Sequence, residues 1–477
     1  MTGKDEKDTA ALEELGRIFS LQRRAHETEG PPDYNTRMEI LDRLLTIIQN
    51  RTDEAVAAMD ADFGSRSTAE ILVAEIYTTA SGIRYLQKNL KALMRTRKRA
   101  SNAVFLPGRS SVIVQPKGVT GVLAPWNYPF YLALLPLATA LAAGNRVMCK
   151  PSEFTPRTSE LMATMISEIL PPEGAAVITG GPDVGGAFSR MPFDHLLFTG
   201  STAVGRMVMG AASQNLTPLT LELGGKSPAL VCPDYSLQTA AERIAAGKSF
   251  NAGQTCVAPD YALVPTTKAE PFAEQVLACW RRFYPTITDN PDYTAIINER
   301  HYERLAGYLA QAREKGATVI SLKTTKSDRA RAMRKLPPSV VLGATPDMDL
   351  SREEIFGPIL PVYEYQDLNE AIRFINARPR PLALYLFTER RKNREKVLVR
   401  TTSGGVTIND TMLHVAQDDL PFGGIGPSGM GAYHAREGFY AFSHCKAVFT
   451  QKSPSAVSFM RPPYSYLLDK ILRMLIG

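Results

Sequence analysis

Apolar residues in the first hundred positions recur every three to four residues, as expected for amphipathic helices. The clearest stripe is formed by Leu41, Leu44, Leu45 and Ile48. This spacing predicts helices through residues 8–55, with a break at the Pro31-Pro32 pair, and again through residues 69–93. The N-terminal part of the chain is therefore expected to be largely helical.

Short apolar segments replace the helical stripes from residue 110 onward. Segments 110–115 and 119–123 are predicted strands. An alternation follows, in which strands at 146–149, 176–179 and 195–199 lead into helices near 158–169, 183–189 and 201–212. Strands separated by helices form parallel sheets covered by helices, so this stretch predicts a doubly wound parallel sheet.

A second α/β unit is predicted after the Gly224-Gly225 pair. Its strands are expected at 229–231, 261–264 and 339–341, its helices at 237–250, 270–280 and 299–315, and a loop or short helix at 323–335. A length of 477 residues is typical of two or three domains. The fold class is therefore α/β with more than one domain.

Composition and charge are those of an ordinary soluble globular protein. Hydrophobic residues make up 44% and charged residues 22% of the chain, and the net charge of +7 is small for this length. The most basic stretch consists of Lys91, Arg95, Arg97, Lys98 and Arg99. Aromatic residues are not interleaved with it, so we interpret it as a solvated helix end and expect no nucleic-acid partner.

Five cysteines are spread along the chain, at Cys149, Cys232, Cys256, Cys279 and Cys445. They form no C-x-x-C pair and share no ligand spacing with the six histidines, so neither a disulfide framework nor a metal site is predicted. The N-terminus resembles no secretory signal, and no run of 18 apolar residues occurs. A cytoplasmic location is therefore expected.

One cysteine stands in a segment suited to chemistry. Cys256 ends the sequence Asn251-Ala-Gly-Gln-Thr-Cys, a glycine-containing loop of small and amide-bearing residues. Such a loop leaves a thiol approachable and lets backbone N–H groups gather around the atom that the thiol attacks. We therefore interpret Cys256 as a candidate nucleophile.

Two segments offer this nucleophile chemical partners. Glu222 precedes the Gly-Gly turn and becomes a suitable general base if an apolar pocket raises its pKa. Asn127 lies in a Pro-Trp-Asn-Tyr-Pro loop and can donate an amide N–H to an oxyanion. Taken singly, Glu222 would be better explained as a solvated loop acid, and Asn127 is equally explained as a turn asparagine.

Three further segments can contact a ligand. The Gly200-Ser201 turn joins a strand to a helix, where backbone N–H groups can approach a phosphate, although a plain turn explains it as well. Lys150 and Glu153 follow a strand at the carboxyl edge of the sheet, as a ligand site or a surface ion pair. Glu354 lies at a Gly-Pro turn, where it can hold a ribose or remain solvated.

Together these motifs resemble the NAD(P)-dependent aldehyde dehydrogenases. Asn-x-Gly-Gln-x-Cys, Leu-Glu-Leu-Gly-Gly-Lys, Pro-Trp-Asn-Tyr-Pro, Phe-Thr-Gly-Ser-x-x-Val-Gly and Glu-Glu-Ile-Phe-Gly-Pro all occur in the order of that superfamily, and the resemblance runs from about residue 20 to 450. Segments 251–261, 380–384 and 414–434 are most similar to the compact class-three branch and its bacterial coniferyl aldehyde dehydrogenases. Ala435 departs from the pattern, because a glycine usually follows this histidine.

The resemblance implies a division of the chain into functional parts. It implies a Rossmann-like cofactor-binding domain (1–100 and 117–224), an α/β catalytic domain (225–402), a small β element for oligomerisation (101–116 and 430–460) and an amphipathic tail (461–477). It also implies a homodimer. The tail is too short to span a bilayer, so packing on the dimer is favoured over contact with a membrane surface.

The resemblance also implies a covalent mechanism. Cys256 would attack the aldehyde, the Asn127 amide and the Cys256 N–H would hold the oxyanion, and a nicotinamide would accept the hydride. Glu222 would activate the water that hydrolyses the thioester. A coenzyme A-acylating dehydrogenase is the alternative, which Glu222 disfavours, and a non-catalytic protein with the same fold is disfavoured by the complete residue set.

Cofactor and substrate contacts are carried over residue by residue. The cofactor set is Pro125, Trp126, Lys150, Ser152, Glu153, Gly200, Ser201, Val204, Gly205, Leu223, Gly224, Glu354 and Phe356. Glu153 favours NAD, because a carboxylate repels a 2′-phosphate, but class-three relatives use either cofactor. Tyr128, Phe250 and His414 are candidates for the channel of an aromatic aldehyde such as coniferyl aldehyde, or of a medium-chain aldehyde.

Overall fold

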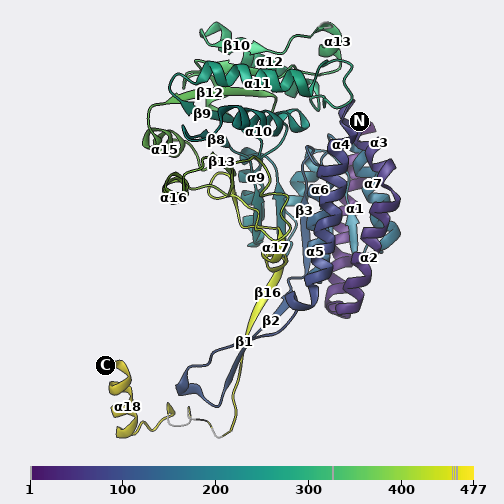
Figure 1. The fold of residues 1–477 in the computed structure, drawn as a ribbon. Helices are drawn as coiled ribbons and strands as arrows, with labels where there is room; N and C mark the ends of the chain where they lie inside the picture. Colours follow the sequence, from purple (N-terminus) through teal and green to yellow (C-terminus); the bar gives the residue numbers. More distant parts are fainter. Residues whose placement is uncertain (1–2, 325–326, 454, 456, 458–459) are drawn as a thin grey trace.

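Three β-sheets organise the computed structural model of the protein, which describes residues 3–324, 327–453, 455, 457 and 460–477. Two large sheets each form the centre of an α/β layered unit, and the third is a narrow arm that projects from them (Figure 1). The predicted α/β fold class is confirmed.

The first unit contains a six-stranded sheet with the order β15-β7-β6-β3-β4-β5. Its strands are β3 (Val119–Leu123), β4 (Arg146–Lys150), β5 (Ala175–Val177), β6 (His195–Thr199), β7 (Leu219–Glu222) and β15 (Gly429–Met430). All pairs are parallel except β15 with β7. Every residue of β3 and β6 is buried, because helices cover both faces of the sheet.

Eight helices surround this sheet or extend its helical layer. They are α1 (Gly3–Glu29), α2 (Tyr34–Asn50), α3 (Thr52–Phe63), α5 (Thr78–Leu93), α6 (Tyr131–Ala142), α7 (Pro156–Ile169), α8 (Pro182–Ser189) and α9 (Thr202–Ala212). Apolar residues of α1, α8 and α9 pack on one face of the sheet, and those of α2, α5, α6 and α7 belong to the core on the other. The short α4 (Thr68–Ile71) and the π-helix η1 (Leu72–Tyr77) join α3 to α5.

The second unit contains a seven-stranded sheet with the order β10-β11-β12-β9-β8-β13-β14. Its strands are β8 (Pro228–Val231), β9 (Tyr261–Pro265), β10 (Thr318–Ser321), β11 (Ser339–Leu342), β12 (Ile359–Tyr365), β13 (Ala383–Phe387) and β14 (Gly405–Ile408). The helices α10 (Leu237–Ser249), α11 (Ala269–Phe283) and α12 (Glu299–Glu314) cover one face, and α15 (Leu368–Asn376) and α16 (Arg391–Arg400) cover the other. The short α13 (Ser327–Ala332) and α14 (Asp349–Arg352) lie in connections.

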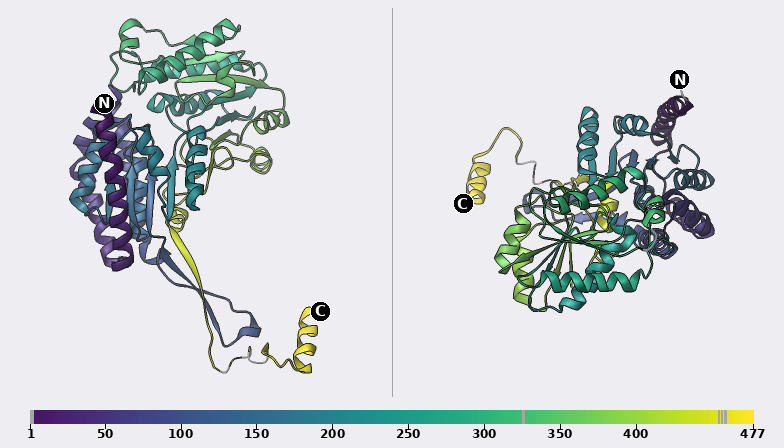
Figure 2. Two further views of the ribbon diagram at one scale, coloured as in Figure 1. Left: turned by 180° about the vertical axis from the view of Figure 1, so that it is seen from behind. Right: turned by 90° about the horizontal axis from the view of Figure 1, so that it is seen from above.

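The arm is an antiparallel sheet of β1 (Arg97–Arg99), β2 (Arg109–Pro116) and β16 (Ser443–Thr450). Figure 2 shows it extending away from both α/β units, with the terminal helix α18 (Tyr466–Ile476) beyond it. The predicted apolar stripe of α18 is exposed, since Leu467, Ile471 and Leu475 are each more than 40% accessible. No helix in the described part of the chain is long and apolar enough to cross a membrane.

Several expected boundaries differ from those observed. The basic stretch was expected to end a helix, but α5 ends at Leu93 and Arg97–Arg99 form strand β1, because pairing with β2 overrides the local charge pattern. β14 extends the second sheet beyond the expected limit at residue 402. The C-terminal part of the arm begins at Ser443, because β15 joins the first sheet and α17 (Ala435–Ala441) packs against α5 and α6.

Candidate active site

The candidate nucleophile lies on a turn that reverses the chain after α10. Asn251, Ala252 and Gly253 have left-handed φ values of 51°, 50° and 74°. A Cβ atom at Gly253 would lie 2.3 Å from the Gly357 carbonyl oxygen, so only glycine fits there. The turn is closed by the Gln254 N–H, which donates to the Asn251 oxygen at 3.0 Å. This backbone places the half-buried Cys256 in a cavity lined by residues of both α/β units, among them Glu222 and Glu354.

Two cavities meet at Cys256. One has a volume of about 260 Å³ and is lined by Asn127, Glu222 and Glu354, among others. The other has a volume of about 520 Å³ and a largely apolar lining that includes Tyr128 and Phe250. The thiol is therefore approachable from two sides, one rich in polar groups and the other suited to an apolar molecule.

Asn127 is held with its amide facing the cysteine loop. Its Nδ2 donates a hydrogen bond to the Gln254 carbonyl oxygen at 3.2 Å, and the residue is buried. An amide nitrogen carries two N–H groups, so one is committed to this contact and the other remains for the cavity shared with Cys256. Asn127 is therefore an amide donor fixed in a cavity that Cys256 also lines.

Glu222 ends β7 and directs a buried carboxyl group into the same cavity as Cys256. Neither Oε1 nor Oε2 has a hydrogen-bond partner among the described residues. Burial alone raises the pKa of Glu222 well above its usual range. A carboxyl group with a raised pKa can hold a proton as a general acid and, once ionised, accept one as a general base.

The environment of Cys256 disfavours the thiolate form of its side chain. Burial raises its pKa to about 12, and the neighbouring Glu354 and Glu222 carboxyl groups contribute in the same direction. A thiol with this pKa is protonated at neutral pH, so it needs a proton acceptor before it can attack. Glu222 is such a group in the same cavity.

The polar cavity gathers eight of the thirteen residues predicted to bind the cofactor. These are Pro125, Trp126, Gly200, Ser201, Leu223, Gly224, Glu354 and Phe356. A Cβ atom at Gly224 would lie 1.9 Å from Glu354 Oε2, so the Gly-Gly turn is required for this carboxyl group to approach. Burial raises the pKa of Glu354 to about 8. The buried Thr199 hydroxyl and both Glu222 oxygens lack partners here among the described residues, which fits a cavity built for a polar ligand.

The Gly200-Ser201 turn opens α9 as the sequence predicts. Ser201 is the N-cap and its Oγ accepts from the Val204 N–H at 3.3 Å, while the first turn carries no acidic residue. A Cβ atom at Gly205 would lie 2.6 Å from a Leu223 methyl carbon, so this glycine allows α9 to pack closely. Val204 is 45% exposed and adds an apolar surface beside the turn. A helix start of this kind can bind a phosphate group.

The remaining predicted cofactor residues lie at the carboxyl end of β4. Lys150 Nζ is 3.6 Å from Glu153 Oε2, and Ser152 Oγ accepts from the Phe154 N–H at 3.2 Å. Burial lowers the pKa of Lys150, and the Glu153 and Asp8 carboxylates oppose this shift. Asp8 was not predicted: it belongs to α1, and its Oδ1 accepts from the Gly181 N–H at 3.0 Å. No sequence motif marks Asp8.

Three more residues of the polar cavity were not predicted: Thr199, and His301 and Arg304 of α12. The His301 ring lies 5.1 Å from Trp126, centroid to centroid, and Arg304 Nη2 donates to the Ile355 oxygen at 3.0 Å. Both therefore support residues of the cavity wall, Trp126 and the Glu354 segment. Polar residues at this spacing occur on any surface helix, so no sequence pattern identified His301 and Arg304 as cavity residues.

Lys226 and Asp260, which belong to two other motifs, also hold the Glu354 segment in place. Lys226 Nζ donates to Asp260 and to the carbonyl oxygens of Leu350 and Glu353, the latter two at 2.8 Å. Asp260 Oδ1 accepts from the Ile355 N–H at 2.8 Å. Three distant motifs are thus joined in one buried contact.

The apolar cavity contains two of the three predicted channel residues. Tyr128 and Phe250 line it, together with Tyr131, Leu132, Phe283, Met412, Leu413, Val415, Phe422 and Tyr433. His414 lies outside this lining, because its Nδ1 contacts Thr407 Oγ1 at 2.8 Å and its ring faces Gly405. Its neighbours Leu413 and Val415 face the cavity instead, so the expectation for His414 is corrected.

Comparisons with known proteins identify the family of the chain. Residues 11–448 match the aldehyde dehydrogenase family. A probable coniferyl aldehyde dehydrogenase of Pseudomonas aeruginosa is 49% identical, with 97% of this chain and 96% of that protein covered.

Two solved structures show how far the likeness extends. A substrate-bound AldH of Staphylococcus aureus has a TM-score of 0.92 at 36% identity, covering 97% of this chain and 99% of that one. An NAD-dependent aldehyde dehydrogenase of Sinorhizobium meliloti has a TM-score of 0.84 at 27% identity, covering 95% and 89%. The chain therefore belongs to the aldehyde dehydrogenase family, as an enzyme that oxidises aldehydes with a nicotinamide cofactor.

Proposed function

We propose that this enzyme oxidises an aromatic or medium-chain aldehyde, such as coniferyl aldehyde, to the carboxylic acid through a thioester on Cys256. The observation that carries the proposal is the position of Cys256 between a polar cavity and an apolar one. The polar cavity offers a base and an amide donor, and the apolar cavity offers space for the substrate.

Each step is assigned to a residue of this chain. Cys256 Sγ bonds to the carbonyl carbon as its proton passes to Glu222, and the alkoxide is held by Asn127 Nδ2 and the Cys256 N–H. A nicotinamide cofactor bound by the polar cavity would supply the two-electron acceptor. After Glu222 has released the thiol proton to solvent, it takes a second proton, from the water that attacks the thioester. That proton passes to the sulfur, which releases the acid and restores the thiol.

Glu222 must be ionised to accept a proton, and its burial raises the free energy of that ionisation. A water-activating base next to the thiol is of little use if coenzyme A accepts the acyl group. The relatives' names give no support to the coenzyme A-acylating alternative either.

The apolar cavity favours an uncharged substrate with a ring. Its aromatic lining suits stacking or edge contacts with a planar group. The charged residues of its lining are paired: Arg243 donates to Asn409 and to Tyr235 Oη at 2.8 Å, and Arg243 Nε lies 3.7 Å from Asp410. A charged substrate therefore finds little unpaired charge to bind.

Kinetics with a panel of aldehydes test the substrate class. We expect kcat/KM for coniferyl or cinnamyl aldehyde to exceed that for acetaldehyde by about 100-fold or more, because a buried ring or chain adds several kcal/mol of transfer free energy, at about 0.8 kcal/mol per CH₂. Phe250→Ala should narrow this ratio, while Leu398→Ala, at an exposed site on α16, should leave it unchanged. Equal kcat/KM values for acetaldehyde and the aromatic aldehydes would contradict the proposed substrate class.

The cofactor preference is proposed to be NAD. Glu153 and Asp8 place two carboxylates near Lys150, and like charge disfavours a 2′-phosphate. Glu153→Ser should raise kcat/KM with NADP by about tenfold, which corresponds to about 1.4 kcal/mol. Quenching of Trp126 fluorescence on titration with NAD or NADP measures the same preference without turnover, and Asp8→Asn tests the second carboxylate. A wild-type enzyme that binds NADP more tightly than NAD would contradict this assignment.

A homodimer is also proposed, with the arm as its contact. Both edge strands of the arm, β1 and β16, have only β2 as a neighbour in the described chain. Unpaired edges are surfaces on which a second copy can add strands or pack. Most of β16 is exposed in the single chain, which leaves this surface available.

A further inference from the structure

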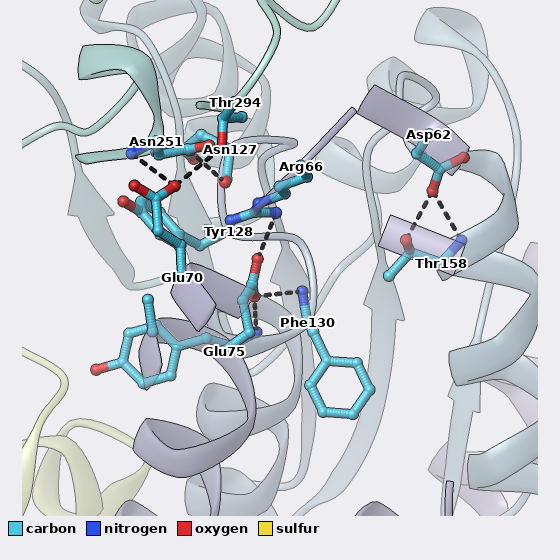
Figure 3. A network of polar contacts seen from close by, with 12 residues as sticks. Asp62, Arg66, Glu70, Glu75, Asn127, Tyr128, Phe130, Thr158, Asn251 and Thr294 are labelled. Carbon is cyan, nitrogen blue, oxygen red and sulfur yellow. Dashed lines mark hydrogen bonds and ion pairs between the residues drawn. The ribbon is translucent and has the colours of Figure 1, made fainter. Parts of the chain in front are cut away.

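Three buried charged residues lie close to the active site and have no place in the proposed chemistry. They are Arg66, Glu70 and Glu75, on the short segment that joins α3 to α5 (Figure 3). Arg66 is 2% exposed and Glu75 is fully buried. Burial of such groups is costly unless they make specific contacts, so their partners are informative.

Glu75 holds the loop that carries Asn127. Its Oε2 accepts from the Phe130 N–H at 3.1 Å and from the Tyr131 N–H at 2.8 Å. Its Oε1 is paired with Arg66 Nη1 at 2.8 Å. The Arg66 guanidinium also lies 5.3 Å from the Tyr128 ring, so the ion pair contacts both ends of the segment 128–131.

Glu70 holds the loop that carries Cys256. Its Oε2 accepts from the Asn251 N–H at 3.0 Å and from the Thr294 hydroxyl at 2.9 Å (Figure 3). Asn251 is the first residue of the left-handed turn, so this contact stabilises a backbone conformation that non-glycine residues rarely adopt.

The two loops are joined through the same asparagine. Asn251 Nδ2 donates to the Asn127 carbonyl oxygen at 3.0 Å and to the Gln254 oxygen at 3.2 Å. Asn127 Nδ2 donates to that same Gln254 oxygen. The direction of the Asn127 amide therefore depends on the position of Asn251, which Glu70 holds.

We propose that Glu70, supported by the Arg66–Glu75 ion pair, is a positioning residue for the oxyanion site. It fixes the position of the loop that carries Asn127 relative to the loop that carries Cys256. It acts through Asn251 and touches no reacting atom. The proposal rests on the proposed function, because it assigns Asn127 the role of oxyanion donor. A displacement of about 1 Å at such a donor costs a large part of its effect.

Two reactions of the Cys256 thiol separate positioning from mere stability. Acylation by p-nitrophenyl acetate, without cofactor, develops an oxyanion, whereas alkylation by iodoacetamide does not. For Glu70→Ala we expect acylation and kcat to fall about 10- to 100-fold, less than the roughly 10²- to 10³-fold loss that follows complete removal of an oxyanion donor, because Asn127 is displaced and not removed. Alkylation of the thiol and the Kd for NAD should change by less than about threefold, since neither needs the oxyanion site.

Matched variants complete the test. Glu70→Gln should restore acylation to within about threefold of wild type, because its amide oxygen still accepts from Asn251; burial raises the Glu70 pKa to about 7, so a neutral group suits the site. Asp62→Ala is the control, since Asp62 also accepts backbone N–H bonds, from Arg157 and Thr158, but contacts neither loop. If Glu70→Ala does not fold, Glu70→Asp, one methylene shorter, replaces it.

The outcomes are distinct. Selective loss of acylation in Glu70→Ala, with rescue by Gln, supports the proposal. Equal loss of acylation and alkylation, or no loss of either, overturns it while leaving the proposed function standing. A wild-type enzyme that is not acylated at Cys256 and oxidises no aldehyde refutes the proposed function and this inference with it.

Discussion

Cys256→Ala should abolish aldehyde oxidation, lowering the rate of NADH formation by a factor on the order of 10⁴ or more. The thiol is the nucleophilic side chain at the junction of the two cavities, and a methyl group cannot form a thioester. Hydride transfer from an aldehyde requires a prior adduct at the carbonyl carbon, and this variant lacks the thiol that forms the adduct. Stopped-flow absorbance at 340 nm measures the rate.

The matched control for this variant is Cys445→Ala. Cys445 is an exposed thiol on the arm, far along the chain from the loop of Cys256, and its replacement should leave kcat within about twofold of wild type. Binding of NAD to Cys256→Ala should still quench the fluorescence of Trp126, which would show that the polar cavity is intact. Substantial NADH formation by Cys256→Ala would contradict covalent catalysis.

Glu222→Gln should lower steady-state turnover by about 10²- to 10⁴-fold, the usual contribution of a general base. An amide cannot accept the proton of the attacking water, so the thioester should accumulate and appear as an acyl adduct in the intact mass. The first turnover should be slowed less than the steady state if deacylation depends most on this base. Unchanged deacylation in Glu222→Gln would remove the residue from the mechanism.

The raised pKa of Glu222 gives this prediction a pH dependence with a definite sign. In wild type, kcat should rise with pH as the buried carboxyl group ionises, and Glu222→Gln should lose that rise. The unfolded chain ionises near pH 4.3, so the wild-type free energy of unfolding falls as pH increases from there toward the folded pKa. The Glu222→Gln variant lacks this loss. Its free energy of unfolding relative to wild type should therefore be higher at pH 7 than at pH 4, as measured by thermal unfolding.

The sequence predicted most elements because their signals are local. Strand β6 and helix α9 follow the expected alternation within one or two residues, and the Gly200-Ser201 turn between them was identified from small residues at a helix start. β1 was missed because Arg97–Arg99 have no strand pattern of their own and become a strand only by pairing with β2.

The candidate nucleophile, base and amide donor could also be predicted from the sequence, whereas the residues that hold their loops could not. Cys256, Glu222 and Asn127 stood out because each lies in a motif with glycine, proline or amide neighbours. Glu70 and Glu75 lie on a segment that reads as an ordinary helix, and only the fold shows that both are buried beside the loops they hold. His414 shows the converse: its place beside channel residues did not predict the side to which its ring turns.

By itself, then, the sequence determined the α/β alternation, the family and the residues able to act as nucleophile, base and amide donor. These depend on side-chain chemistry and on periodicity over a few residues, which are properties of the chain alone. Only the tertiary structure decided that Glu222 is buried with no hydrogen-bond partner among the described residues, that burial raises the pKa of the Cys256 thiol, and that Asn127 is held by Asn251. Burial, pKa and the contact between distant loops arise from packing, because they depend on which segments exclude water from one another.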